Sequence, residues 1–228
     1  MRKQTLAEKA AEELIEMIRE MGRQPGEKLP TEPELMQRLG VGRNTVREAL
    51  RILLSRNIVT IRQGAGTFIS EKNGVSDDPL GFEMIEDRRK LTRDLLEVRV
   101  MMEPQIAALA AQNAEAEDIG MLEATLLRLE ERMAQRKSYA ELDSAFHAAV
   151  ARCSHNQVIA TLIPVISDGV QMFAENVEQT EYAQTKRAHR KIFDAIAEHR
   201  AVDAEREMYY HLMFNLNRYQ REPSKHAH

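Results

Sequence analysis

The 228-residue sequence predicts a mainly α-helical protein made of two parts. In the first part, the glycine turn Gly40-Val41-Gly42 separates two short helical patterns, and two strand-like runs joined by a glycine-rich tip follow them. Beyond residue 80, apolar residues recur every three to four positions without useful strand alternation. These observations predict an N-terminal winged helix-turn-helix over residues 1–72, a polar linker over 73–79 and an antiparallel helical bundle over 80–222.

Three helices and a hairpin are expected in the first part. An apolar stripe predicts a helix over about residues 5–21. Thr31 fits the N-cap of a second helix, because Glu34 stands at the capping-box position. A third helix restarts at Asn44-Thr45, with its apolar stripe at Val46, Leu50, Leu53 and Leu54. The hairpin follows, with strand-like runs at 57–61 and 67–69 and a basic tip at 62–66.

The third helix and the hairpin tip are rich in basic and amide side chains. Arginine can pair with guanine, asparagine with adenine, and a helix N-terminus attracts phosphate. From Arg38 to Arg62 there are six arginines and one acid, Glu48, in a chain whose net charge is −4. This basic island indicates double-stranded DNA as a partner, although Arg47 or Arg51 alone could equally belong to a solvated helix face. The candidate DNA contacts are Arg43, Asn44, Thr45, Arg47, Arg51, Arg62, Gln63 and Gly64.

Charge distribution and residue content limit the ligands of the second part, the membrane association and the disulfide bonding that can be expected. Residues 1–72 hold thirteen Lys and Arg against ten Asp and Glu, which leaves the remainder of the chain at −7. An anionic ligand of the second part therefore needs a local cation or a metal. No run of eighteen apolar residues predicts a membrane span, and the N-terminus lacks the apolar segment of a signal peptide. The single cysteine, Cys153, excludes an internal disulfide, fits a reducing cytoplasm and is expected to be a packed thiol.

The second part is expected to contain helices only. Two prolines, Pro104 and Pro164, should each kink or restart a helix. The predicted helical segments are about 80–86, 91–113, 115–136, 138–153, 156–179, 181–199 and 201–220.

Four residues of the predicted bundle form a candidate metal site. Asp143 and His147 are spaced i and i+4, so they share one helix face, and His189 and His211 continue the apolar stripes of their own helices. A carboxylate and three imidazoles aimed at a bundle core suit a first-row divalent ion. Two other interpretations stay open from spacing alone: hydrogen-bonded core histidines, and a simple Asp143–His147 ion pair. His155 and His199 lie near helix ends and are interpreted as solvent-facing structural residues.

The N-terminal motifs resemble the GntR family of bacterial transcription regulators. The matching residues are Gly26, Leu29-Pro30-Thr31-Glu32, Glu34-Leu35, Gly40-Val41, Arg43, Val46-Arg47-Glu48-Ala49-Leu50, Leu53 and Arg62-Gln63-Gly64-Ala65-Gly66-Thr67. The resemblance implies that Arg43 and Arg47 contact bases and phosphates, and that the wing tip at Gln63-Gly64 enters the minor groove. Some relatives carry an arginine after the Leu-Pro-x-Glu segment, where this chain has Pro33, so the contact from that helix is not carried over.

The second part resembles the FCD effector domain of the FadR-type subgroup of that family. The matching residues are Leu96-Glu97-Val98-Arg99, Glu103-Pro104, Ala107, Ala110-Ala111, Asp143, His147, Asn156, His189, Ile192, Ala195-Ile196 and His211-Leu212. The resemblance implies that Asp143 and the three histidines bind a divalent metal, zinc before nickel, iron or manganese, and that the metal holds a carboxylate effector.

Two further residues are candidates for contact with such an effector. Arg99 would pair with its carboxylate, or alternatively form a buried salt bridge with Glu103; Asn215 would bind a hydroxyl group, or be an ordinary surface amide. The sequence thus predicts a metabolite-responsive DNA-binding regulator, most often a repressor in this family, acting as a symmetric homodimer on a palindromic operator and not as an enzyme. The rival hypotheses are a metal-dependent enzyme, with Glu103 or Asp168 as an unplaced base, and a regulator with a purely structural metal.

Overall fold

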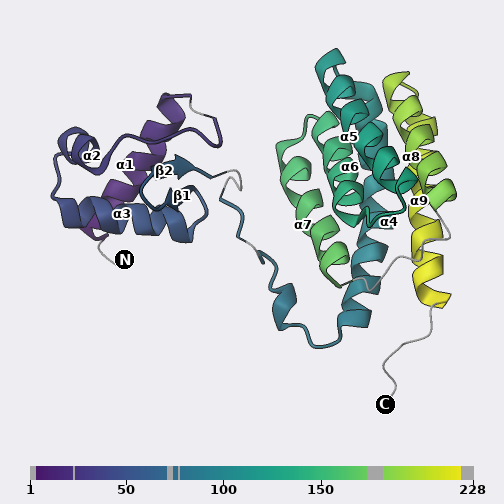
Figure 1. Ribbon diagram of the computed structural model, residues 1–228, viewed down its shortest axis with the longest axis horizontal. Helices are drawn as coiled ribbons and strands as arrows, with labels where there is room; N and C mark the ends of the chain where they lie inside the picture. The colour runs from purple at the N-terminus through teal and green to yellow at the C-terminus, as the bar shows by residue number, and fades with distance from the viewer. Residues whose placement is uncertain (1–3, 23, 71–73, 77, 174–181, 222–228) are drawn as a thin grey trace. The chain divides into compact units, whose positions relative to one another are not determined.

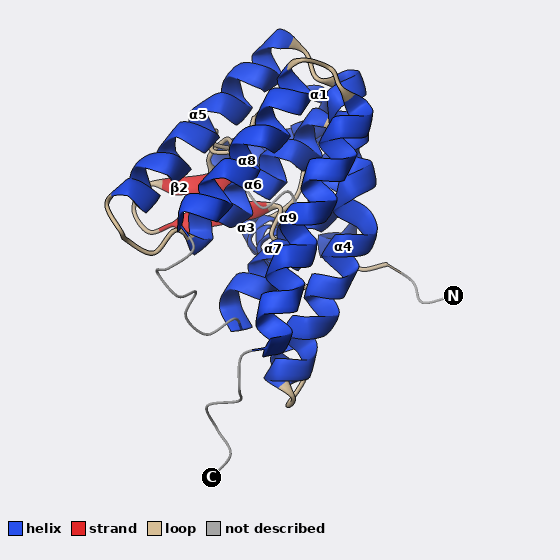
Figure 2. Cartoon of the chain, turned by 90° about the vertical axis from the view of Figure 1, so that its right-hand side faces the viewer, coloured by secondary structure: helices blue, strands red, loops and turns tan. Residues whose placement is uncertain are grey.

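The computed structural model describes residues 4–22, 24–70, 74–76, 78–173 and 182–221 (Figure 1). The chain divides into two compact units, Met1–Pro79 and Leu80–His228. The first combines three helices with one small sheet, and the described residues of the second form helices joined by loops, without a strand (Figure 2). The predicted mainly α fold is therefore confirmed. No helix within the described ranges is both long and apolar enough to cross a lipid bilayer.

The first unit contains α1 (Leu6–Glu20), α2 (Glu32–Leu39) and α3 (Arg43–Ser55). Thr5 begins α1 through a reciprocal capping box, in which the Glu8 backbone N–H donates to Thr5 Oγ1 and the Thr5 N–H donates to Glu8 Oε2. Gly40 ends α2 with a left-handed φ of 63°, which glycine adopts without a Cβ clash, and so creates the tight turn before α3. The buried core of this unit includes Ala10, Leu14, Leu35, Val46, Leu50, Leu53 and Val59.

The wing is an antiparallel pair of short strands, β1 (Val59–Arg62) and β2 (Gly66–Ile69). The pairing register runs from Val59 opposite Ile69 to Arg62 opposite Gly66, which leaves residues 63–65 as the tip. Gly64 at the tip and Gly66 at the start of β2 have φ values of 74° and 118°, so both occupy backbone conformations that other residues rarely adopt. The predicted strand-like run at 57–61 begins two residues too early, because Asn57 and Ile58 form the turn that leaves α3.

The second unit contains α4 to α9, which lie side by side in Figure 1. Their bounds are α4 (Arg88–Asn113), α5 (Ala116–Ala134), α6 (Ala140–Cys153), α7 (Gln157–Phe173), α8 (Tyr182–Ala197) and α9 (Ala201–Arg221). The longest helix, α4, packs along α9 and also contacts α6, α7 and α8, so it lies at the centre of the bundle. One core cluster gathers around Leu122, Leu126, Phe146, Ile192 and Met208, and a smaller one around Leu95, Ile106 and Ile163.

Two sequence expectations about this unit were wrong in part. Residues 80–86 form only a single 3-10 turn, η1 (Phe82–Met84), because the left-handed Gly81 and the extended Ile85 bound it. Pro104 and Pro164 restart nothing, since each lies inside a continuous helix. Tertiary packing on both sides of α4 outweighs the one backbone hydrogen bond that an internal proline removes. The end of the predicted 156–179 helix lies outside the described residues.

Candidate metal centre and nucleic-acid interface

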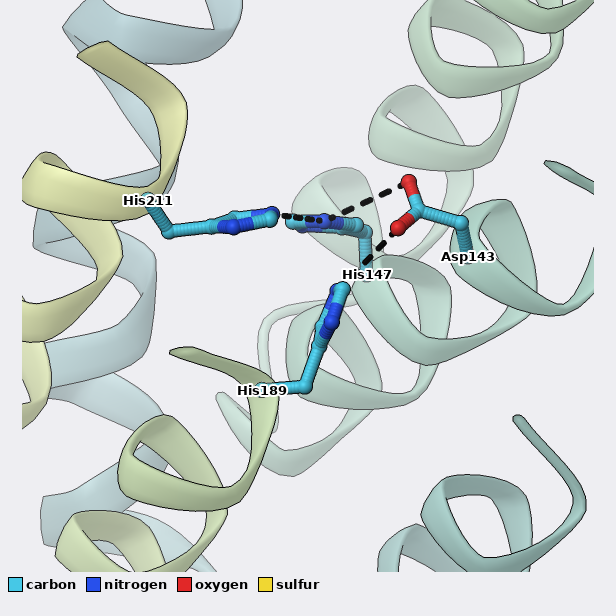
Figure 3. A group of neighbouring side chains, drawn as sticks. All are labelled: Asp143, His147, His189 and His211. Atoms are coloured by element: carbon cyan, nitrogen blue, oxygen red, sulfur yellow. Dashed lines mark hydrogen bonds and ion pairs between the residues drawn. The ribbon is translucent and has the colours of Figure 1, made fainter. Parts of the chain in front are cut away.

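Three helices bring the four predicted metal ligands together. Asp143 and His147 lie one turn apart on α6, His189 comes from α8 and His211 from α9 (Figure 3). One possible ligand atom of each residue lies within 4.8 Å of those of the other three. The three imidazoles are buried, whereas 19% of the Asp143 side chain is exposed. The cluster is thus enclosed by the bundle on the histidine side and accessible at the carboxylate.

The donor atoms converge on one point. Asp143 Oδ1 lies 3.1 Å from His189 Nε2, and Asp143 Oδ2 lies 3.8 Å from His147 Nε2. His211 Nε2 lies 3.3 Å from His147 Nε2, with the two rings stacked. All three histidines therefore present the same ring atom, Nε2, to the centre of the cluster.

The opposite nitrogens of two rings are held by acceptors. His189 Nδ1 donates to the backbone carbonyl of Thr185 at 2.9 Å, and His147 Nδ1 hydrogen bonds with Glu103 Oε2. Burial alone would raise the pKa of Glu103, but Arg99 and His147 outweigh it and lower that pKa to about 2. An ionised carboxylate and a carbonyl can only accept, so both rings carry their proton on Nδ1 and offer the Nε2 lone pair.

The protonation states favour a cation in this cluster. Burial, followed by the nearby Arg99 charge, lowers the pKa of His147, and burial followed by the other two histidines places that of His211 well below its usual value. Burial would raise the pKa of Asp143, but the interaction with His189, followed by the charges of His147 and His211, outweighs it and lowers the pKa. These shifts favour the neutral form of the His147 and His211 imidazoles and the ionised form of the Asp143 carboxylate.

One buried atom supports the fit of these residues to a metal ion. His189 Nε2 has no hydrogen-bond partner among the described residues, and it faces the carboxylate oxygen of Asp143. With the ring proton on Nδ1, two lone pairs point at each other, which is costly in a buried site unless a cation lies between them. Nitrogen and oxygen donors of this kind suit a divalent first-row ion.

A cavity of about 430 Å³ adjoins the cluster, and Asp143 lies in its wall. The other described lining residues come from α4, α6, α7, α8, α9 and the segment before α6: Leu96, Arg99, Ser138, Tyr139, Ala140, Ser144, Ser167, Val170, Gln171, Tyr182, Thr185, Asn215, Arg218 and Tyr219. This volume holds a small metabolite. Both predicted effector contacts, Arg99 and Asn215, are therefore cavity residues.

Both interpretations of Arg99 have support in the geometry. Its Nε atom lies 2.5 Å from Glu103 Oε1, in a buried ion pair. Its Nη2 atom has no hydrogen-bond partner among the described residues, and the side chain lines the cavity. Burial alone would lower the pKa of Arg99, but Glu103 and Asp143 raise it above its usual value, so the group remains a cation. Asn215 Nδ2 lies 3.4 Å from His211 Nε2, at the border of cavity and cluster.

Several site residues escaped sequence reasoning. The contact of Glu103 with His147 joins residues on different helices, and the only sequence signal was the i, i+4 spacing of Arg99 and Glu103 on α4. Ser167 and Tyr139 line the cavity without any recognisable motif. The possible catalytic bases are engaged elsewhere: Glu103 by Arg99 and His147, and Asp168 by the Ser144 hydroxyl at 2.7 Å.

The residues interpreted as structural behave accordingly. His155 and His199 are exposed at left-handed positions, where His155 Nε2 contacts Asp118 at 2.7 Å and His199 Nδ1 donates to the Ala111 carbonyl at 2.9 Å. Cys153 is a buried free thiol, and burial raises its pKa to about 11. A neutral buried thiol is a poor nucleophile and a poor metal ligand.

The candidate DNA contacts of the first unit lie on α3 and the wing tip. Of the eight predicted residues, seven are exposed and Thr45 is half-buried. Arg43, Asn44 and Thr45 form the first turn of α3, after Gly42 at its N-cap. The backbone N–H groups of that turn and the positive end of the helix dipole favour a phosphate there.

Three arginines of this surface already have partners. Arg47 Nε donates to both carboxylate oxygens of Glu32, at 3.0 and 3.1 Å, and thereby links α3 to the start of α2. Arg51 Nη1 lies 3.3 Å from Glu48 Oε2 on the same helix. The Arg62 guanidinium lies 4.5 Å from the centre of the Phe68 ring. Because these contacts are exposed, they hold the side chains weakly and can be exchanged for phosphate.

Comparisons with known proteins identify bacterial transcription regulators as relatives of both units. Residues 6–69 match the family model of bacterial regulatory proteins of the gntR family, and residues 94–214 match the FCD domain. The galactonate operon transcriptional repressor of Escherichia coli K12 is 30% identical over 179 residues, which cover 75% of this chain and 78% of the relative. The Glc operon transcriptional activator of the same strain is 27% identical over 202 residues, covering 84% and 80%.

A solved structure supports the same assignment. The Streptococcus agalactiae GntR structure is 38% identical, superimposes with a TM-score of 0.81, and the match covers 92% of this chain and 99% of that one. Two family models, a curated relative at 30% identity and a solved structure therefore agree on both parts of the molecule. The chain belongs to the GntR family of bacterial regulatory proteins and is a DNA-binding transcriptional regulator with an FCD effector domain.

Proposed function

We propose that this regulator binds a divalent metal through Asp143, His147, His189 and His211, and that a small carboxylate effector binds beside the metal and changes the affinity of the protein for its operator. A bound divalent ion supplies an open coordination position for a carboxylate oxygen. Arg99 orients the same carboxylate through its second guanidinium nitrogen, and Asn215 binds a neighbouring polar group of the ligand.

The observation that carries the proposal is the unpartnered Nε2 atom of His189. A cation bound between this buried nitrogen and the carboxylate oxygen 3.1 Å away would relieve the repulsion between their lone pairs, and the adjoining cavity, which Asp143 lines, gives a ligand access to the cluster. Arg99 lines the same cavity, and its Nη2 atom has no hydrogen-bond partner among the described residues. These two unpartnered atoms favour a sensing site over a structural one.

The DNA-binding part of the proposal concerns the operator and the oligomeric state. The exposed first turn of α3 would read the major groove, and Gln63-Gly64 at the wing tip would reach the adjacent minor groove. A homodimer would present two such units to a palindromic site. Effector binding then regulates transcription to the extent that it favours one arrangement of the two DNA-binding units, typically by about 1–3 kcal/mol.

Metal binding is tested first. We expect the protein, purified without chelator, to contain about one equivalent of a divalent metal per chain by elemental analysis, and to lose thermal stability on treatment with EDTA. His147→Ala and His189→Ala should each remove the metal, whereas His155→Ala should not, because His155 is exposed and lies outside the cluster. A wild-type metal content equal to that of His147→Ala would refute the metal site.

DNA binding is tested with the segment upstream of the chain's own gene, labelled for fluorescence anisotropy. We expect affinity in the nanomolar range at low salt, and a change of about 5- to 150-fold when the effector saturates the metal-loaded protein. Light scattering of the free and DNA-bound protein reports the dimer. Absence of binding at low salt would contradict the operator assignment, and an effect of carboxylates that persists after metal removal would contradict the metal-linked site.

A further inference from the structure

One serine in the wall of the effector cavity is buried and yet lacks a hydrogen-bond partner. Ser167 lies on α7, is 2% exposed and lines the cavity, and its Oγ atom has no partner among the described residues. The hydroxyl of Ser144, another cavity residue, is by contrast engaged, since it donates to Asp168 Oδ1 at 2.7 Å. A buried hydroxyl without a partner is costly, so Ser167 calls for an explanation in the function of the site.

A contact between α6 and α7 places Ser167 beside the metal cluster. Ser144, which donates to Asp168 across the two helices, directly follows the candidate ligand Asp143 on α6. Ser167 directly precedes Asp168 on α7. Asp143 and Ser167 therefore flank the same hydrogen bond, and both line the same cavity.

Packing between α4 and α7 brings Ser167 to the part of the cavity wall that holds Arg99. A Cβ atom added at Gly169 on α7 would lie 3.1 Å from Leu95 Cδ1 on α4. Ser167 lies about 3 Å along α7 from Gly169, and Arg99 lies one turn, about 6 Å, along α4 from Leu95. Arg99 also has an unpartnered atom, Nη2, among the described residues. Two unpartnered polar groups, one cationic and one neutral, thus lie in adjoining walls beside the metal cluster.

These two groups suit different atoms of one ligand. A guanidinium nitrogen can only donate, and a carboxylate oxygen is among its strongest partners. A serine hydroxyl both donates and accepts, so it can pair with another hydroxyl group. The staggered χ1 positions of serine let its oxygen turn to a ligand without backbone movement. A ligand whose hydroxyl stands next to its carboxylate would satisfy both groups at once.

We propose that Ser167 is the specificity-determining residue of the effector site, and that its hydroxyl binds a hydroxyl group on the carbon next to the effector's carboxylate. The inference rests on the proposed effector site, in which the metal and Arg99 hold the carboxylate, and makes that site more specific. An acid without this hydroxyl leaves Ser167 unpaired in a cavity from which it has displaced water. The site therefore selects 2-hydroxy acids over the corresponding unsubstituted acids.

Titration calorimetry on the zinc-loaded, full-length protein tests the inference with two series of acids. In the first, lactate carries a 2-hydroxyl, 3-hydroxypropionate a 3-hydroxyl and propionate none; the second compares gluconate with 2-deoxygluconate. In a series that binds, we expect the 2-hydroxy acid to bind roughly 5- to 50-fold more tightly than the acid without that hydroxyl, the range for one buried hydrogen bond.

The decisive variant is Ser167→Ala, because coordination of the ligand hydroxyl by the metal could produce the same preference in the wild type. Ser167→Ala should lower the affinity for the 2-hydroxy acid by about the same factor of 5 to 50 and leave metal content, thermal stability and the affinity for the unsubstituted acid unchanged. Thr161→Ala is the matched control. It removes a hydroxyl from an exposed position on α7 that is not among the described cavity residues, and it should bind every acid as wild type does.

Three outcomes would overturn the inference while the metal-linked effector site stands. Ser167→Ala could bind every acid as wild type does, which would show that the hydroxyl pairs within its own helix. It could weaken all acids equally, or 3-hydroxypropionate could bind the wild type more tightly than lactate does. If no acid binds, or if binding survives EDTA treatment, the proposed effector site fails with the inference.

Discussion

Glu103 joins Arg99 to His147 across the interior of the helical unit. Its Oε1 atom pairs with Arg99 Nε at 2.5 Å, and its Oε2 atom accepts the hydrogen bond from His147 Nδ1. Arg99 lines the effector cavity and His147 belongs to the metal cluster. One buried carboxylate thus fixes the orientation of a cavity cation and, at the same time, the tautomer of a candidate metal ligand.

Glu103→Gln should weaken metal binding by about 10- to 100-fold, as expected for loss of a hydrogen-bond partner behind a metal-binding histidine. A glutamine can accept from His147 Nδ1, but its NH₂ group then faces the Arg99 guanidinium, and both are donors. The buried Arg99 charge also loses its counterion, which should lower the free energy of unfolding by about 3–5 kcal/mol. Competition with a metal-sensitive dye measures the affinity, and thermal denaturation measures the stability.

The matched control is Glu97→Gln. Glu97 lies on the same helix, pairs with Arg93 at 3.5 Å and is 47% exposed, so its loss should change neither metal affinity nor stability beyond a few tenths of a kcal/mol. Equal metal affinities of the two variants would show that Glu103 does not support the metal ligand.

The candidate site could be predicted from sequence only where the signal was local or came from a family resemblance. Asp143 and His147 share a helix face by their spacing, and this holds in the structure. Nothing in the spacing of His189 and His211 places them against α6; the resemblance to FCD domains supplied that expectation. The Glu103–His147 contact spans 44 residues and two helices, so no periodicity could indicate it.

In the fold, too, features set by nearby residues could be predicted from the sequence, whereas features set by tertiary packing could not. Apolar periodicity and the Thr31 cap predicted the helices of the first unit, because these signals act within one or two turns. The predicted helix over 91–113 is confirmed, but the restart considered at Pro104 is absent, since a local rule against internal prolines ignores the packing of α4 against four other helices. The 80–86 segment misled the prediction for a similar reason: its apolar residues cover the end of the bundle without forming a regular helix, as the packing of Phe82 near Leu95 and Gly169 shows.

Arg47→Ala should weaken binding to the upstream DNA by about 1–3 kcal/mol if Arg47 contacts a base. If Arg47 contacts a phosphate, the variant should also lower the slope of log binding constant against log salt concentration by about one. Its side chain is exposed on α3 and held by Glu32 through an exchangeable ion pair. Fluorescence anisotropy at several salt concentrations separates the two roles. Arg19→Ala removes the same charge from α1 and is the control; equal losses in the two variants would indicate only a general electrostatic effect.

Two helical glycines of the bundle should respond oppositely to alanine. A Cβ atom at Gly169 on α7 would lie 3.0 Å from Phe82 Cε2 and 3.1 Å from Leu95 Cδ1, so Gly169→Ala should destabilise the helical unit by about 1–3 kcal/mol through overpacking. Gly120 on α5 is exposed, and a Cβ atom added there would meet no described atom within 4 Å, so Gly120→Ala should stabilise by about 0.5–1 kcal/mol. Urea denaturation of the two variants measures both effects, and a neutral Gly169→Ala would show that η1 does not pack firmly on α7.

Alkaline pH should destabilise the helical unit through two buried groups. Burial raises the pKa of Cys153 from about 9 to about 11, and burial followed by the Asp143 charge raises that of Tyr139 from about 10 to about 12. Between these values the unfolded chain loses protons that the folded chain retains. The free energy of unfolding is therefore unaffected by these groups below about pH 9 and falls as the pH rises through 9 to 12.

Thermal denaturation between pH 8 and pH 11 measures this loss. Cys153→Ala and Tyr139→Phe should each make the decline shallower, because each removes one of the two groups.

The same burial makes the native thiol slow to react. A disulfide reagent at pH 8 should label Cys153 rapidly in urea but, in the folded protein, only at the rate of local or global opening. A labelling rate in the folded protein equal to that in urea would show that Cys153 is not protected by the core around Phe146 and Leu126. A pH profile of stability that is the same in both variants and in wild type would show that neither Cys153 nor Tyr139 has a raised pKa in the folded protein.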